Sequence, residues 1–479
     1  MNKKITHHSI VICAAVALAS PLLALAWEQP VLAPGRALIF PDDSQIASRT
    51  NVVRVFHPAV CDRAPVLEGG FVYGTVNPRS EGGWRMWYNT GWEVCIADSE
   101  DGRKWTRPTN NVVFKGYHSP AVLLDAFEKD PARRYKMVGA VLSCPKFGVV
   151  DRQQTGYYVS TSSDGVHWQG KRRALPGWDT VAMAQHPETG EIFIYHKNLQ
   201  PLPGRDEERR FVLVSSSKDF DHWSTPVLAL APDEVDDNAW ADNPDQRTDI
   251  YNMPVFSYAG GFIGFPTIFR ITSRFPMGPD RKKDIASPFV LDDGPIDVQM
   301  ATSNDGVLWK RTPGRRTMIA RGAPGTFDCG QVPGLAGGSL LTRGEETSIY
   351  YYAINKLHGE IVTNGGGTRI SIGRAVWRRW GFASLGSSTR GSFVTKPVRL
   401  GTADVRINAK PCPDPRDGAS WLRVTVLSPD GAVLAVSKDL SCDGTLVKPI
   451  WKQGAPPRDR PVRLRFDFHA MSVYAVECL

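Results

Sequence analysis

Three patterns are missing from this 479-residue chain, and each absence argues against a class of protein. After residue 25 no long apolar run remains that could span a membrane, so we expect no membrane partner for the mature chain. The formal net charge is +8, but no long basic stripe interleaves with aromatic residues, which disfavours nucleic-acid binding. No CxxC or HxxxH spacing suggests a zinc site. We therefore expect no nucleic-acid partner, no bound metal and no cofactor.

The first residues have the pattern of a signal peptide, which we predict over 1–26. Lys3 and Lys4 precede an apolar run over 10–25, and Ala24-Leu25-Ala26 fits a small-x-small cleavage site. The run is short for a membrane span, which favours cleavage over anchoring. We therefore expect a secreted or periplasmic protein that acts as a monomer.

Cysteine usage fits export without defining a disulfide framework. Export permits disulfides, but an odd number of cysteines after residue 26 leaves at least one thiol without a partner. A pair among Cys412, Cys442 and Cys478 would staple a small C-terminal domain. The remaining cysteines are Cys61, Cys95, Cys144 and Cys329.

One short phrase recurs four times: a serine, an acid two residues later and a tryptophan four residues after the acid. The acid can accept hydrogen bonds from N–H groups of its own turn, glycine supplies positive φ, and tryptophan returns to pack between sheets. The phrase resembles the Asp-box of β-propeller proteins such as sialidases. It predicts fold and not catalysis. The four copies are Ser99–Trp105, Ser162–Trp168, Ser217–Trp223 and Ser303–Trp309.

The repeats divide a predicted all-β chain into five units. Short alternating runs, abundant glycine and proline, and the lack of a long helical period indicate strands. Five units of roughly four strands predict a five-bladed β-propeller within 27–393. From 394 to 479 the alternation changes, and Ser428-Pro-Asp-Gly431 marks a strong turn, which predicts a β-sandwich accessory domain. The units cover 70–105, 120–168, 179–223, 249–309 and 328–380, where the phrase has decayed.

Acids stand just before the predicted inner strands of three units. Asp179, Asp249 and Asp328 hold this place, and His118 holds the comparable place in the second unit. Because inner strands start at one mouth of a propeller channel, we expect these side chains to converge there. Asp42 and Asp43 would add acids from the segment that closes the ring. The alternative is that each acid caps its strand or bridges to a neighbouring blade.

Converging carboxylates suit glycoside cleavage, in which one acid protonates the leaving oxygen and another carboxylate attacks or activates water. We favour Asp43 as nucleophile or base and Asp179 or Asp249 as acid, with Asp328 as a further catalytic candidate. Asp42 is assigned to substrate binding, as is His118. Aromatic and bidentate arginine side chains suit sugar contacts. The further substrate-binding candidates are Trp178, His196, Arg247, Tyr251 and His358.

The layout resembles the five-bladed glycosidases of families 32, 43 and 68. It is most similar to uncharacterised secreted bacterial proteins of the glycosyl hydrolase family 32 N-terminal-like group, which implies a glycosidase with a C-terminal sandwich. The invertase-type Trp-Met-Asn-Asp-Pro opening is absent, so no family role is transferred. The motifs shared with that group are Arg85-Met-Trp-Tyr, Ala97-Asp-Ser-Glu-Asp-Gly, Arg133-Arg-Tyr-Lys-Met, Tyr251-Asn-Met-Pro-Val-Phe, Gly325-Thr-Phe-Asp328 and Arg463-Leu-Arg-Phe.

Two alternatives to an exported glycosidase of this kind stay open. A non-catalytic, lectin-like propeller would use the same acids to hold sugar hydroxyls or a structural calcium ion in the channel. A sialidase-like hydrolase is the other, although five units argue against the usual six blades. In all three cases the expected partner is a carbohydrate.

Overall fold

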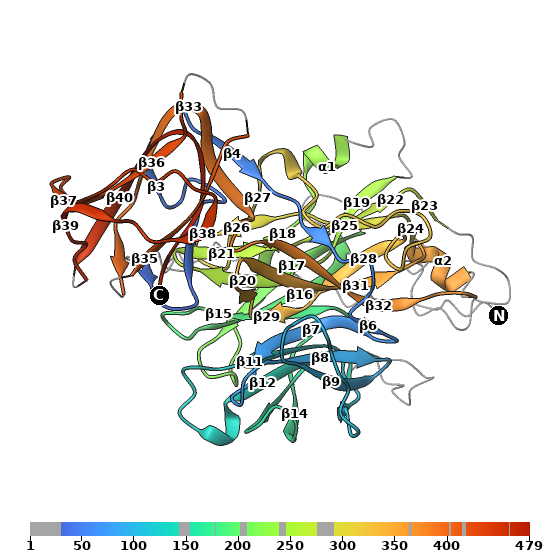
Figure 1. Cartoon of the computed structure of the whole chain (residues 1–479). Coiled ribbons are helices and arrows are strands. Elements are labelled where there is room, and N and C mark those ends of the chain that lie inside the picture. Colours follow the sequence, from blue (N-terminus) through green and yellow to red (C-terminus); the bar gives the residue numbers. More distant parts are fainter. Residues whose placement is uncertain are drawn as a thin grey trace, which may run out of the picture.

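The computed structural model describes residues 30–142, 154–177, 179–201, 208–238, 246–274, 292–363, 366–401, 404–413, 418–458 and 460–479. The predicted signal peptide, Cys144 and Trp178 lie outside these ranges. As predicted, the fold is all-β, with a propeller-like arrangement of sheets and a C-terminal β-sandwich (Figure 1). No helix in the described ranges is long and apolar enough to cross a membrane.

The first three predicted units each form a separate antiparallel sheet. Their strands are connected in sequence order, so each sheet is a meander from an inner strand to an outer one. The sheets consist of β7 (Phe71–Pro78), β8 (Trp84–Thr90), β9 (Glu93–Ser99) and β10 (Val112–Lys115); β11 (His118–Leu124), β12 (Tyr135–Val141), β13 (Gly156–Ser162) and β14 (Trp168–Leu175); β15 (Val181–Gln185), β16 (Ile192–Pro201), β17 (Glu208–Ser217) and β18 (Val227–Leu230).

The fourth unit is split across two sheets by a bend. Pro254 and Pro266 interrupt neighbouring strands at the same level, since proline has no N–H to donate to a ladder, and the Phe265 N–H bonds across to the Pro254 carbonyl at 2.9 Å. One half joins a nine-stranded sheet and the other forms its own four-stranded sheet. The strands are β19 (Arg247–Asn252), β22 (Thr267–Ile271) and β25 (Ile296–Val298) in the first half, and β20 (Val255–Tyr258), β21 (Gly261–Gly264), β26 (Ala301–Ser303) and β27 (Lys310–Arg311) in the second.

The fifth unit shares the nine-stranded sheet with the fourth, because β25 pairs in parallel with β28. The five predicted blades are therefore not reproduced as five separate sheets. The strands of the fifth unit are β28 (Gln331–Leu335), β29 (Gly337–Gly338, paired with β7), β30 (Leu341–Arg343), β31 (Glu346–Ile354) and β32 (Ile370–Arg378). Short elements complete the rim: α1 (Glu234–Asn238), β23 (Ser273–Arg274), β24 (Asp292–Asp293) and α2 (His358–Thr363).

Three of the four repeated turns, those with a glycine after the acid, fasten their unit to a neighbouring unit by the same hydrogen bond. In the second copy, Asp164 Oδ1 accepts the N–H groups of Val166 and His167 at 2.8 Å, as the sequence predicts for such a turn. The glycine carbonyl that follows then accepts a hydrogen bond from the second strand of the preceding unit. Trp87 Nε1 donates to the Gly165 carbonyl at 2.8 Å, and Tyr195 Oη donates to the corresponding glycine of the fourth unit at 2.7 Å. The repeats therefore join neighbouring units.

The first copy of the turn makes the same contact across the ring. Tyr350 of β31, in the fifth unit, donates to the Gly102 carbonyl in the first unit. Its ring also meets Trp105 edge to face, with centroids 5.1 Å apart. The ring of units is therefore closed by the same kind of hydrogen bond that joins neighbouring units.

The segment before the first unit contributes to both parts of the molecule. Its strands β5 (Val60–Cys61) and β6 (Leu67–Glu68) pair with β32 at the outer edge of the fifth unit. Its earlier strands enter the C-terminal sheet beside β33 (Ala383–Thr395) and β40 (Pro461–Cys478). These are β1 (Val31–Leu32), β2 (Ala37–Ile39), β3 (Ile46–Thr50) and β4 (Val53–Phe56). The predicted boundary between residues 393 and 394 lies inside β33.

The C-terminal part encloses one apolar core under two long shared strands, β33 and β40. Leu38 and Phe40 from near the N-terminus lie in this core with Phe393 and Phe466. Figure 1 shows the blue N-terminal strands among the red C-terminal ones. The remaining strands are β34 (Val398–Leu400), β35 (Val405–Pro411), β36 (Trp421–Leu427), β37 (Val433–Ser437), β38 (Gly444–Val447) and β39 (Trp451–Gly454).

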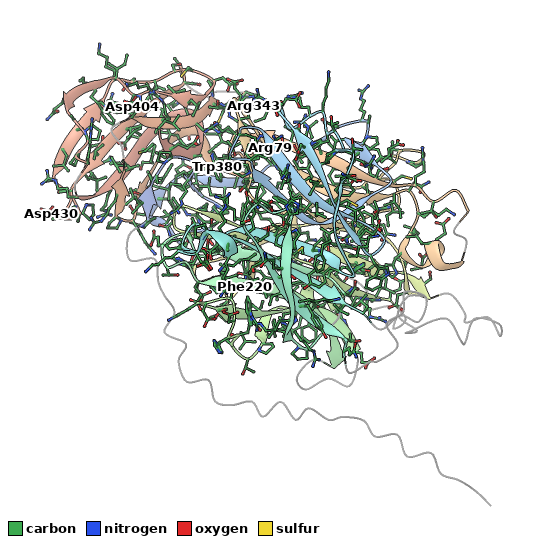
Figure 2. All side chains as sticks on the ribbon, turned by 90° about the horizontal axis from the view of Figure 1, so that it is seen from below. Arg79, Phe220, Arg343, Trp380, Asp404 and Asp430 are labelled. Carbon is green, nitrogen blue, oxygen red and sulfur yellow. The ribbon has the colours of Figure 1, made fainter. Side chains whose placement is uncertain are left out.

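A buried ion pair connects the sandwich to the fifth unit. Arg379, just after β32, binds the Glu477 carboxylate through two nitrogens at 2.6 and 2.8 Å. Trp380 Nε1 donates to the same carboxylate at 3.0 Å, and Figure 2 shows Trp380 where the two parts meet. The expected disulfide among Cys412, Cys442 and Cys478 is not formed, since all three are free thiols.

Candidate active site

The inner strands β7, β11, β15, β19 and β28 begin at one end of the propeller, where charged and aromatic side chains converge. We call this group the mouth cluster. Its members come from the first, second and third strands of several units and from the segments beside α2. They are Phe71, Tyr73, Trp92, His118, Asp179, Lys197, Arg209, Arg210, Arg247, Asp249, Tyr251, Asp292, Tyr352 and His358.

Asp179 stands two residues before β15, as predicted, and its carboxylate has a lysine at one oxygen and a histidine near the other. Oδ2 forms an ion pair with Lys197 Nζ, and Oδ1 lies 3.8 Å from His118 Nδ1. The side chain keeps 17% of its surface exposed, whereas Lys197 keeps 2%. Burial by itself raises the pKa of Asp179. Lys197 and His118 lower it by more than burial raises it, so the pKa lies below its ordinary value. Asp179 is therefore an ionised, partly accessible carboxylate.

Two inner strands open with residues in the left-handed backbone region. Asp179 has φ of 75° and Ser119, beside His118, has φ of 52°. Such conformations cost roughly 1–3 kcal/mol for residues other than glycine and persist where the surroundings impose them. The Ser119 N–H donates to Asn89 Oδ1 at 3.1 Å, and its Oγ lies 2.7 Å from His118 Nδ1. The strain is thus concentrated beside the pair formed by His118 and Asp179.

Lys197 connects Asp179 to an aromatic wall. It lies on β16, and its Nζ sits 3.6 Å from the centroid of the Tyr251 ring. A buried ammonium over an aromatic face is stabilised by about 2 kcal/mol or more. The lysine is therefore held in place by one carboxylate and one ring.

Asp249 lies in β19 and is fully buried under three arginines. Its oxygens lie 3.2 Å from Arg209 Nε, 2.8 Å from Arg210 Nη1 and 3.4 Å from Arg247 Nε. Asp292 is also fully buried and binds Arg210 at 3.0 Å and Arg247 at 2.8 Å. A buried carboxylate surrounded by cations balances charge and has no exposed surface to offer a substrate. Asp249 therefore joins the cluster as predicted but in a structural position.

Tyr251 and His358 form a directed hydrogen-bond chain. His358 Nδ1 lies 2.9 Å from the Asp292 carbonyl, which can only accept, so Nδ1 carries the proton and Nε2 is the acceptor. The Tyr251 hydroxyl, 3.3 Å from Nε2, therefore donates to it. Burial, followed by the charge of Arg210, lowers the pKa of His358 to about 4. Burial raises the pKa of Tyr251, so the phenol stays neutral, and Tyr73 adds a hydrogen bond to it.

Aromatic rings line one side of the cluster. Phe71 packs against Tyr352 with centroids 5.3 Å apart and against His118 at 5.6 Å, and Trp92 packs against His118 at 5.8 Å. Phe71 and Trp92 are only partly buried. Partly exposed rings of this kind can stack on the C–H face of a sugar.

The acids of the closing segment lie elsewhere. Asp43 is 52% exposed and pairs with Arg54 and, at 3.1 Å, with Arg49 of β3 in the C-terminal sheet. Asp42 accepts the Ser44 N–H at 2.8 Å and lies near Tyr258. Tyr258 is the last residue of β20, whereas Asp249 lies in β19, at the other end of the fourth unit's inner strand. The structure therefore does not bring Asp42 or Asp43 to the mouth cluster.

Asp328 and His196 are also separate from the cluster. Asp328 accepts hydrogen bonds from Thr326 and Tyr351, each at 2.7 Å, and Tyr351 packs in the core between the fourth and fifth units. His196 packs against Tyr157, and neither ring nitrogen has a hydrogen-bond partner among the described residues. Burial lowers the pKa of His196 to about 4. Both side chains serve the interior of the fold.

Several members of the cluster were not predicted. Lys197, Arg209 and Arg210 lie on second and third strands, so a search limited to inner-strand starts misses them. The alternation of strand residues offered one signal: His196 and Lys197 point to opposite faces of β16, and only one of the two can face Asp179. Phe71 and Trp92 carried no distinguishing pattern.

The described residues contain no group of three or more His, Cys, Asp or Glu side chains arranged to hold a metal ion. The mouth cluster instead pairs each of its carboxylates with lysine or arginine.

No protein-family model and no curated protein matches the chain. Among solved structures, an N-acetylgalactosamine deacetylase from F. plautii in complex with blood group B trisaccharide is 15% identical with a TM-score of 0.42, covering 69% of this chain and 96% of that one. A β-1,2-mannobiose phosphorylase from Listeria innocua is 12% identical with a TM-score of 0.40, covering 69% and 97%. A glycoside hydrolase family 43 arabinoxylan arabinofuranohydrolase from Bacillus subtilis is 8% identical with a TM-score of 0.33, covering 96% of each chain. Scores at this level assign the chain neither a family nor an activity.

Proposed function

We propose that this protein is an exported glycoside hydrolase whose site is the mouth cluster, with Asp179 as its ionised carboxylate. One observation carries the proposal: Asp179 is a partly accessible carboxylate on a strained backbone, fixed by a buried lysine, and its neighbour His118 packs against partly exposed aromatic rings. Strained residues cluster at functional sites, and perturbed carboxylates do so as well. The location outside the cytoplasm rests on the N-terminal sequence alone.

The direction of the pKa shift assigns the role of Asp179. A general acid needs a raised pKa, whereas the pKa of Asp179 is lowered, so this group suits attack on the anomeric carbon or activation of water. We therefore propose Asp179 as nucleophile or base, in place of the acid role that its sequence position suggested. Phe71 and Trp92 would stack on the sugar ring whose bond is cleaved.

One observation favours the lectin-like alternative. Hydrolysis of a glycoside uses two carboxylates, and Asp249 and Asp292 are both fully buried under arginines. The same pairing weakens the sialidase-like alternative, since Arg210 and Arg247 already neutralise aspartates and do not present an open triad to an anionic sugar.

The test is a screen of the mature protein against diverse polysaccharides, in which reducing ends and binding are both measured. We expect turnover by the parent protein, and a loss of about 10²- to 10⁴-fold in kcat for Asp179→Asn, the range for removing a group that transfers protons. Asp43→Asn is the matched control, because that aspartate is exposed on the sandwich side, and it should keep parental turnover. Full activity of Asp179→Asn would refute the site. Binding without turnover by the parent would favour the lectin.

Chemical rescue then separates a catalytic carboxylate from a structural one. In Asp179→Gly, added azide or formate can occupy the vacated space and restore part of the turnover if the carboxylate attacks or activates water. A purely structural Asp179 would give no rescue, and its replacement would lower the unfolding temperature.

A further inference from the structure

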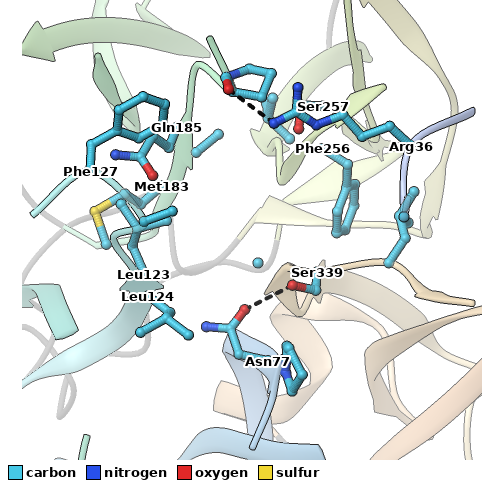
Figure 3. A pocket seen from close by; sticks show the side chains of 18 of the residues that line it. Arg36, Asn77, Leu123, Leu124, Phe127, Met183, Gln185, Phe256, Ser257 and Ser339 are labelled. Carbon is cyan, nitrogen blue, oxygen red and sulfur yellow. Dashed lines mark hydrogen bonds between the residues drawn. The ribbon is translucent and has the colours of Figure 1, made fainter. Parts of the chain in front are cut away.

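A cavity lies at the end of the propeller away from the mouth cluster, where the inner strands β7, β11 and β15 finish. Its volume is about 350 Å³, within the usual range for small-ligand sites. Its wall includes the last residues of β7, β11 and β15, the first three residues of β20, the residues around β29, and residues 34–36 of the closing segment (Figure 3). We call it the lower pocket. Asp179 precedes β15 and Gln185 ends it, so the lower pocket and the mouth cluster stand at the two ends of one strand.

Gln185 presents an acceptor to the lower pocket. Both protons of its amide are used, because Nε2 donates to Asp125 Oδ1 at 2.6 Å and to the Gly190 carbonyl at 3.0 Å. The carbonyl oxygen Oε1 is therefore the atom that a ligand can reach. Asp125 Oδ1 also accepts the Phe127 N–H at 2.9 Å, so one carboxylate positions two residues of the wall.

The support behind these residues is rigid. Asp125 Oδ2 pairs with Lys136 Nζ at 2.9 Å, and that lysine, which is 2% exposed, also binds Glu128 at 2.7 Å. Sites whose wall residues are held by such a buried second layer are preorganised for binding.

Asn77 and Arg36 supply donors to the lower pocket. Asn77 Oδ1 accepts from Ser339 Oγ at 3.2 Å and its Nδ2 bonds to the Val122 carbonyl at 3.3 Å, which leaves the second Nδ2 proton. Arg36 Nη2 donates to the Pro187 carbonyl at 2.9 Å, which leaves its other N–H groups. The nearby carboxylate of Glu188 offsets the charge of Arg36. The lower pocket thus combines donors and an acceptor without a net anion-selecting charge.

Apolar surface stands beside these polar atoms. Phe127 is 46% exposed and Leu124 is 36% exposed at the rim. The Phe127 ring lies over Gly190, where an added Cβ would come within 2.7 Å of it. A large exposed ring held in this way presents a fixed apolar face.

We infer that the lower pocket binds a neutral sugar unit, a mono- or disaccharide or the end of a longer glycan. Sugar hydroxyls both donate and accept hydrogen bonds. They can therefore accept from Arg36 and Asn77 and donate to Gln185. The C–H face of the ring matches the aromatic face of Phe127. The volume equals that of about a dozen water molecules, which suits one or two sugar rings. This site does not depend on turnover at the mouth cluster.

The experiment uses saturation-transfer NMR and titration calorimetry with a panel of neutral methyl glycosides and disaccharides. Every protein carries Asp179→Asn, so that the mouth cluster is the same throughout and substrate is not consumed. We expect Phe127→Ala to weaken binding by about 2- to 10-fold, and Arg36→Met to weaken it as well. Leu308→Ala is the matched control, because that leucine is 68% exposed on a repeated turn, and it should bind as its parent does.

Unfolding temperatures of all variants establish that the loss is local. Equal binding by parent, Phe127→Ala and Arg36→Met would overturn the inference, as would no binding by any neutral sugar in the panel. Turnover by the protein without Asp179→Asn is measured separately. Failure of the lower pocket and failure of the proposed hydrolase therefore give different results.

Discussion

Replacing Asp249 by asparagine separates a structural from a catalytic role for this residue. The substitution keeps shape but removes one negative charge from a site with no exposed surface. Three arginines lie within 3.4 Å of the carboxylate. After the change, Asp292 alone would balance Arg210 and Arg247, and an amide donor would face a guanidinium donor.

The size of the effect follows from burial. Removing one partner of a buried ion pair costs about 3–5 kcal/mol, because the remaining charge has lost both water and its counter-ion. Arg209 keeps an ion pair with Asp237 at 3.0 Å, which limits the loss at that position. We therefore expect Asp249→Asn to lower the free energy of unfolding by about 3–5 kcal/mol.

Denaturant unfolding followed by tryptophan fluorescence measures this change as a shift in midpoint at constant slope. Asp43→Asn is the control, because the ion pairs of that exposed carboxylate contribute at most about 1 kcal/mol. Activity measured well below the unfolding midpoint should be reduced much less than in Asp179→Asn. An Asp249→Asn protein of parental stability that has lost turnover would show that Asp249 is catalytic and that our reading of the arginine network is wrong.

Three further predictions test the site, the turns and the shared core. Because the pKa of Asp179 is lowered, its carboxylate stays ionised as pH falls. We therefore expect the acid limb of the kcat/KM profile to lie below the ordinary aspartate pKa of about 3.9. The stability that its ion pair contributes should be lost as pH falls through the same range. Gly165→Ala should destabilise more than Gly170→Ala in thermal unfolding, because both glycines have positive φ but only the first would place a Cβ 2.8 Å from Trp87. Phe40→Ala should cost about 3–5 kcal/mol in denaturant unfolding and affect the C-terminal sandwich, since its ring packs against Phe393 at 5.1 Å. Parental stability of Phe40→Ala would contradict the shared core.

Local signals predicted the parts of the fold that depend on neighbours in sequence. The repeated turn specifies its own hydrogen bonds, so strand ends and unit lengths could be located without knowing which strands meet. Pairings between distant segments carry no such signal. The sequence of Ile46–Thr50 has no alternation that would assign it to one part of the molecule, and only packing decides that it joins β33.

The candidate site was predictable to the same extent. A residue that starts an inner strand must face the mouth, which brought His118, Asp179 and Asp249 together as expected. The rule fails for Asp328, because two residues separate it from β28 and its turn directs the carboxylate to Tyr351. Whether a carboxylate is open or enclosed depends on arginines from other strands. Sequence position therefore located Asp249 without showing that it is buried.

The pairing of the first strands with the last has a consequence for the order of folding. β2 pairs with β40, and β3 with β33, so residues near the two ends of the chain share one core. During synthesis from the N-terminus, β1 to β4 have no completed sheet to join until β40 has been made. Closing so long a loop is entropically costly and slow, while the propeller units between can assemble from local hairpins. We therefore expect the sandwich to form last, and the early strands to stay open edges until then.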